Sequence, residues 1–178
     1  AVRETAFVAP PRRGPAALWV RIELENIGEQ QMASSILVEM TGKEAPDRFE
    51  DSALVRQGRV VLLSKSPCQA EQNGRALRVD VALKPGQTAH ADFVYPQDAV
   101  SAGPALDDYR AESFEEAYAA FRDYWDGLLR SVAAIEVPEP RIHRMFKAVL
   151  AQLFINADGD IMCYGSAPSA YEGDVFGV

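Results

Sequence analysis

The stretch LWVRIELEN, residues 18–26, alternates apolar and polar side chains with a period of two. One set of positions is Leu18, Val20, Ile22 and Leu24, and the other is Trp19, Arg21, Glu23 and Glu25. Such alternation is typical of a β-strand that turns one face to a core and the other to solvent. We therefore expect the first set to be buried, and Trp19 to point outward among charged neighbours.

Segments of the same kind follow. SSILVEM (34–40) and ALRVDVALK (76–84) alternate, with Ile36, Val38, Met40, Leu77, Val79, Val81 and Leu83 as their inward positions. RVVLLSK (59–65) is apolar on both faces, and QTAHADFVYP (87–96) follows a turn at Pro85–Gly86. We expect this last strand to run antiparallel to the one before it. Short strands joined by turns predict an antiparallel β-sandwich domain over residues 1–96.

Two parts of this domain carry no strand pattern. Residues 1–15 contain several prolines and arginines and are predicted to be a leading segment that enters the first strand. Residues 42–52, GKEAPDRFEDS, are predicted to be a polar loop.

The pattern changes at Gln97, where residues 97–134 are predicted to form a linker with an amphipathic helix. Ser113 and Glu116 have the spacing of a capping box, in which each side chain satisfies a free backbone N–H. Apolar residues then recur at helical spacing: Phe114, Ala117, Tyr118, Phe121, Trp125, Leu128 and Val132. The opposite face carries Glu115, Arg122, Asp123 and Arg130. We expect a helix over about 113–133 that docks by its aromatic stripe.

A second helix is predicted over residues 140–156, because Pro140 suits the first helical turn. Its apolar residues spread over a wide arc: Ile142, Met145, Phe146, Val149, Leu150, Leu153 and Phe154. Such a helix needs apolar partners on more than one side. We therefore interpret residues 135–178 as the start of a truncated all-α domain, in which helix 140–156 is open to self-association.

Composition narrows the function classes. The chain has 178 residues and a net charge of −8, with no basic stripe, so we expect no nucleic-acid partner. No apolar run approaches the roughly 18 residues of a membrane span, so we expect no membrane partner. The two cysteines, Cys68 and Cys163, form neither a disulfide framework nor a zinc motif. Phosphate-binding loops, dinucleotide fingerprints and serine nucleophile motifs are missing from the sequence, and no cofactor or metal is expected.

The order of four short motifs resembles the six-hairpin glycosidases. The motifs are Tyr124-Trp125-Asp126, Val137-Pro138-Glu139-Pro140, Asp158-Gly159-Asp160 and Tyr171-Glu172-Gly173-Asp174. These proteins are bacterial glycoside hydrolases with an N-terminal β-sandwich joined to an (α/α)6 barrel. The likeness is closest over residues 113–178 and extends to the sandwich only by architecture. It implies a β-sandwich, a linker helix and the first helix of a truncated barrel.

The resemblance also implies a function. Glycoside hydrolases cleave a glycosidic bond with two carboxyl groups, and in this family those groups lie mostly on later barrel loops. We therefore expect an N-terminal fragment of a hydrolase of oligo- or polysaccharides, with no catalytic residue of its own. Carbohydrate is the expected partner, with Tyr171 stacking on a sugar while Glu172 and Asp174 accept hydroxyl hydrogen bonds. The alternative for these three residues is a solvated acidic turn.

Other candidates have simpler interpretations. Asp158 and Asp160 offer too few oxygens for calcium and are predicted to end a helix. His90 and His143 have no second ligand at metal spacing. A non-catalytic carbohydrate-binding or structural sandwich module is the alternative function, and it requires aromatic residues on an exposed sandwich face. A third possibility is a structural protein that oligomerises through its C-terminal helix.

Overall fold

The computed structural model describes residues 1–9, 15–42, 45–131, 138–155, 157–158, 161–166 and 169–172, with the side chains of Leu153 and of all residues after Ile155 outside that description. It contains antiparallel sheets and three helices. The chain divides into two compact units, Ala1–Phe121 and Arg122–Val178, which are described separately below.

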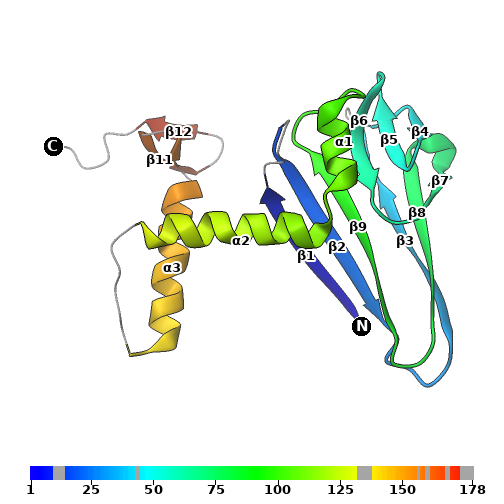
Figure 1. Ribbon diagram of the computed structural model, residues 1–178, viewed down its shortest axis with the longest axis horizontal. Coiled ribbons are helices and arrows are strands. Elements are labelled where there is room, and N and C mark those ends of the chain that lie inside the picture. Colours follow the sequence, from blue (N-terminus) through cyan, green and yellow to red (C-terminus); the bar gives the residue numbers. More distant parts are fainter. Residues whose placement is uncertain are drawn as a thin grey trace. The chain divides into compact units, whose positions relative to one another are not determined.

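The first unit is built on a six-stranded antiparallel sheet (Figure 1). Its spatial order is β1 (Val2–Ala9), β2 (Ala17–Glu25), β9 (Thr88–Pro96), β6 (Arg59–Ser64), β5 (Ala53–Arg56) and β4 (Arg48–Glu50). The predicted leading segment is therefore wrong for most of its length, because β1 pairs with β2 along its whole length. The predicted polar loop likewise contains the short strand β4, which the turn-forming residues around it concealed.

A three-stranded antiparallel sheet packs against the larger one. Its order is β3 (Met32–Glu39), β8 (Ala76–Leu83) and β7 (Gln69–Glu71), and the one-turn helix η2 (Gln72–Gly74) follows β7. The inward positions predicted for β3 and β8 are confirmed, because Ile36, Leu77, Val79 and Leu83 are all buried between the sheets. The antiparallel sandwich is thus the observed architecture.

The turn at Pro85–Gly86 does not close a hairpin within one sheet. It leads from β8, which pairs with β3 and β7, to β9, which pairs with β2 and β6. A turn fixes the reversal of the chain but not the hydrogen-bonding partner of the returning strand. β9 is apolar on both faces over residues 91–94 apart from Asp92, as expected for a strand at the centre of a sheet with two covered faces.

The second face of the larger sheet is covered by helices. Helix α1 (Pro104–Ala111) and the first turns of α2 (Phe114–Arg130) enclose a second core with Phe7, Trp19, Val94 and other apolar residues. Trp19 is fully buried there, so its predicted exposure is wrong. The predicted linker, residues 97–134, contains helix α1 in addition to the predicted amphipathic helix, and Leu106 and Tyr109 of α1 are buried.

Helix α2 begins as its sequence predicts. The backbone N–H of Ser113 donates to Glu116 Oε2 at 2.8 Å, and the N–H of Glu116 donates to Ser113 Oγ at 3.2 Å. Its aromatic stripe docks only in part, because Phe114 is buried and Phe121 packs against the same core, whereas Tyr118 is exposed.

The second unit holds the end of α2, helix α3 (Pro140–Ile155) and the strands β10 (Ala157–Asp158), β11 (Ile161–Ser166) and β12 (Ser169–Glu172). These strands form an antiparallel sheet in the order β10-β11-β12, within the segment 135–178 that was predicted to begin an all-α domain. Among the described helices, none is long and apolar enough to cross a membrane.

Candidate functional site

The residues predicted to contact sugar lie at the end of the second unit. Tyr171 and Glu172 belong to β12, where they pair across the strands with Tyr164 and Cys163 of β11. Their side chains, and all of Asp174, lie outside the described residues. Asp158 ends β10 and pairs with Ile161, so it does not simply terminate a helix, and Asp160 lies outside the description.

Three charged side chains of the first unit, Arg21, Asp92 and Glu115, form a network next to the turn between α1 and α2. Arg21 Nε donates to Asp92 Oδ1 at 2.7 Å, and Arg21 Nη2 donates to Asp92 Oδ2 at 2.7 Å. The side chains of Arg21 and Asp92 are only 15% and 11% exposed. This two-pronged geometry is the strongest form of an arginine–carboxylate pair, and it satisfies both groups inside the fold.

Two residues of helix α2 contact Arg21 and complete this network. Arg21 Nη1 lies 2.6 Å from Glu115 Oε1, and the guanidinium carbon lies 4.1 Å from the centre of the Phe114 ring. Hydrogen bonding to Asp92 raises the pKa of Arg21 against the opposing effect of burial, and hydrogen bonding from Arg21 lowers the pKa of Glu115. Glu115, predicted on the outer face of the helix, therefore ties the helix to the sheet.

Lys65 binds the C-terminal end of α1 beside the same turn. This contact and the charged network together are called the α1–α2 junction below. Its Nζ donates to the carbonyl of Tyr109 at 2.8 Å and to that of Arg110, at the C-terminal end of α1, where a cation also complements the helix dipole. Burial lowers the pKa of Lys65, and the nearby charge of Glu112 opposes that shift. Tyr109 donates its hydroxyl to the carbonyl of Pro15, and burial, with a smaller contribution from Glu112, raises its pKa to about 12.

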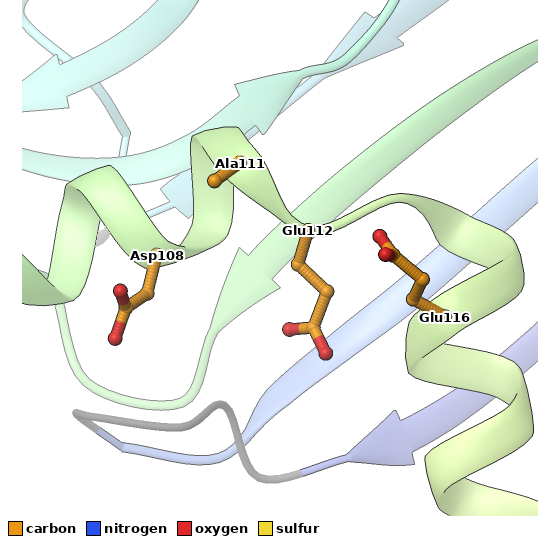
Figure 2. A pocket seen from close by; sticks show the side chains of 4 residues that line it. All are labelled: Asp108, Ala111, Glu112 and Glu116. Atoms are coloured by element: carbon orange, nitrogen blue, oxygen red, sulfur yellow. The ribbon is translucent and has the colours of Figure 1, made fainter.

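A surface pocket of about 220 Å³ lies beside this junction, lined by Asp108, Ala111, Glu112 and Glu116 (Figure 2). Figure 2 shows the three carboxylates coming from the end of α1, the turn, and the start of α2. Glu116 accepts hydrogen bonds from both the backbone N–H and the hydroxyl of Ser113, so one carboxylate is occupied in capping α2. The pocket is acidic and suits hydroxyl or cationic groups.

Among the described residues, no group of three or more histidine, cysteine, aspartate or glutamate side chains is placed to hold a metal ion. His90 is half exposed, with Nε2 3.8 Å from Asp92 Oδ2, at the margin of the charged network. Cys68 is a free, partly buried thiol.

Two signals for this junction were present in the sequence. Asp92 sits inside the apolar run ADFVY, which marks a buried acid in need of a partner. Pro104 with Leu106 and Tyr109 gives a helix start followed by apolar residues three apart. What the sequence did not show is that these elements come together with Arg21.

No protein-family model matches the chain, and no curated protein matches it.

Proposed function

We propose that this chain is the N-terminal part of a glycoside hydrolase acting on oligo- or polysaccharides, consisting of a β-sandwich, a linker helix and the first helix of an (α/α)6 barrel. The support is the order of the four motifs over residues 113–178, which resembles the six-hairpin glycosidases. In this proposal the acid and base of catalysis lie on barrel loops outside residues 1–178, and the chain alone does not hydrolyse glycosides.

The observation that carries the proposal is the apolar surface of α3. Ile142, Met145 and Val149 are 52%, 64% and 55% exposed. Spacings of three, four and seven residues place these three on one side of the helix. Phe146 and Leu150, on the adjoining side, are half-buried. A helix that is apolar over so wide an arc belongs inside a larger helical assembly, and a barrel of paired helices would cover it.

The sandwich acts as a scaffold in this proposal. A sugar-binding sandwich face would present aromatic rings to solvent, but in the described part of the first unit Trp19, Phe93 and Tyr109 are buried. Tyr118 of α2 is the exposed aromatic residue of that unit. These observations weigh against the alternative of a non-catalytic carbohydrate-binding module.

The test is oligosaccharide binding and turnover by the full chain and two tyrosine variants. We expect no hydrolysis of aryl-glycosides, and weak oligosaccharide binding in saturation-transfer NMR that Tyr171→Ala abolishes and Tyr118→Ala leaves intact. Glu172→Gln should also weaken binding, because a carboxylate that accepts sugar hydroxyls is lost. Binding that survives Tyr171→Ala but not Tyr118→Ala would establish the sandwich module instead, and no binding at all would contradict the sugar site.

Self-association through α3 follows from the same exposed surface. We expect sedimentation to show concentration-dependent oligomers, and Met145→Lys to shift the chain toward monomer by placing a charge on the apolar face. Arg144→Glu changes charge at an exposed neighbouring position and serves as the control. A chain that stays monomeric at high concentration without the substitution would contradict this part of the proposal.

A further inference from the structure

The register of the sheet β10-β11-β12 determines which of its residues share a face. In antiparallel strands, residues directly opposite each other lie on the same face, and successive residues of one strand lie on opposite faces. Tyr164 of β11 is directly opposite Tyr171 of β12, and Ser166 is directly opposite Ser169. Residues two apart on one strand share a face, so the two tyrosines and the two serines belong to the same face.

The acidic residues of the described strands belong to the other face. Glu172 is directly opposite Cys163, which precedes Tyr164 in β11. Asp158 of β10 is directly opposite Ile161, two residues before Cys163 and therefore on the same face as Cys163. The sheet thus has one face with aromatic and hydroxyl residues and one face with both of its described acids.

The two residues already expected to contact sugar lie on different faces of β12, because Tyr171 and Glu172 are successive. β12 is an edge strand of the described sheet, with β11 as its neighbour. A sugar unit that meets both residues is therefore held at this edge. From there, a longer sugar chain that follows the tyrosine face crosses β12 toward β11, where Tyr164 occupies the position next to Tyr171.

We propose that Tyr164 is a second sugar-stacking residue, so that the site takes an oligosaccharide running across β12 and β11. This inference rests on the proposed function. One sugar unit stacks on Tyr171 at the edge, and the next unit stacks on Tyr164. Directly opposite residues have Cβ atoms about 4.5–5.5 Å apart, which suits neighbouring units of one sugar chain. Tyrosine also matches a sugar chemically, because it combines an apolar ring with a hydroxyl group.

Charge narrows the class of sugar. Within the described strands, the face of Tyr164 and Tyr171 carries no charged residue. Ser166 and Ser169 add hydroxyls that both donate and accept hydrogen bonds, as sugar hydroxyls require. A uronic acid would find no cation on this face and would meet the carboxylate of Glu172 at the edge. The expected ligand is therefore a neutral oligosaccharide of two or more units.

The test is saturation-transfer NMR and affinity titration of the full chain with gluco-, manno-, galacto- and xylo-oligosaccharides of one to three units, and with digalacturonic acid. We expect a disaccharide to bind more tightly than its monosaccharide, and digalacturonic acid not to bind. Tyr164→Ala should lower disaccharide affinity about tenfold, near the upper end of one aromatic contact. It should leave monosaccharide binding unchanged and remove the saturation signal of one sugar unit. Tyr164→Phe keeps the ring and should retain disaccharide binding. Cys163→Ala, on the opposite face, is the control and should change neither.

The outcomes separate this inference from the proposed function. Absence of binding to every sugar, or binding that Tyr171→Ala does not affect, would overturn both. Loss of binding in Tyr171→Ala with full disaccharide binding in Tyr164→Ala would overturn the second stacking position alone. Equal affinities for monosaccharide and disaccharide would do the same. If Tyr164→Ala loses monosaccharide binding as well, Tyr164 supports the hairpin rather than the ligand, and the inference is wrong. Tight binding of digalacturonic acid would overturn the neutral class.

Discussion

Phe114→Ala should detach α2 from the larger sheet and lower the free energy of unfolding of the first unit. The Phe114 side chain is 6% exposed, and its ring lies 5.1 Å from that of Phe7 in an edge-to-face arrangement. The guanidinium of Arg21 stands over the Phe114 ring. It is therefore the point at which the aromatic cluster and the charged network meet.

The expected loss follows from burial. Truncation of a buried phenylalanine to alanine costs about 3–5 kcal/mol, including the cavity left behind. The upper part of that range applies, because an aromatic pair contributes about 0.5–1.5 kcal/mol and a cation–π contact about 0.5–2 kcal/mol beyond area burial. Trp125, on the same helix, is only partly buried, so Trp125→Ala should cost about 1–2 kcal/mol, well below a fully buried ring.

Urea unfolding followed by tryptophan fluorescence measures this difference. The chain has two tryptophans, so a Trp125→Phe background leaves the fully buried Trp19 as the reporter of the first unit. Phe114→Leu is the matched control: it keeps the apolar volume and should retain most of the stability. A loss below about 1 kcal/mol for Phe114→Ala in that background, or an equal loss for Trp125→Ala measured against the unsubstituted chain, would refute the assignment of Phe114 as the anchor.

Three further predictions concern the first unit. Arg21→Met leaves the Asp92 carboxylate buried without its partner and should cost about 3–5 kcal/mol in urea unfolding, part of which Asp92→Asn should restore; additive losses would argue against the pair. Gly74→Ala combines a φ of +86° with the contact to β4 and should cost more than Gly58→Ala, which has a φ of +78° and open space; equal losses would argue against the close approach. The Tyr109 pKa of about 12 in the fold exceeds the usual value of about 10. The stability from its neutral phenol is therefore complete below about pH 10 and lost as the pH rises through 12, so Tyr109→Phe should flatten the alkaline limb of the stability profile.

Local patterns predicted the elements whose physics is local. The capping box at Ser113 and Glu116, the start of α3 at Pro140, and the inward faces of β3 and β8 depend on neighbours a few residues apart, and all are confirmed. The sugar-contacting residues remain a prediction, because their side chains lie outside the described residues. The charged junction was not predicted, because its members are distant in sequence.

The sequence by itself determined that this protein is an antiparallel sandwich followed by amphipathic helices. Alternation with a period of two indicates that one face of a strand is buried, but it does not say whether the opposite face is also covered. Only the tertiary structure decided that α1 and α2 cover that other face, which buries Trp19, and that β2 pairs with β9 in the register that sets Arg21 opposite Asp92. It also decided that β9 leaves β8 for the other sheet. The physical reason is that a strand's own pattern records which of its faces is apolar, while its partners are chosen by the surface that all the elements bury together.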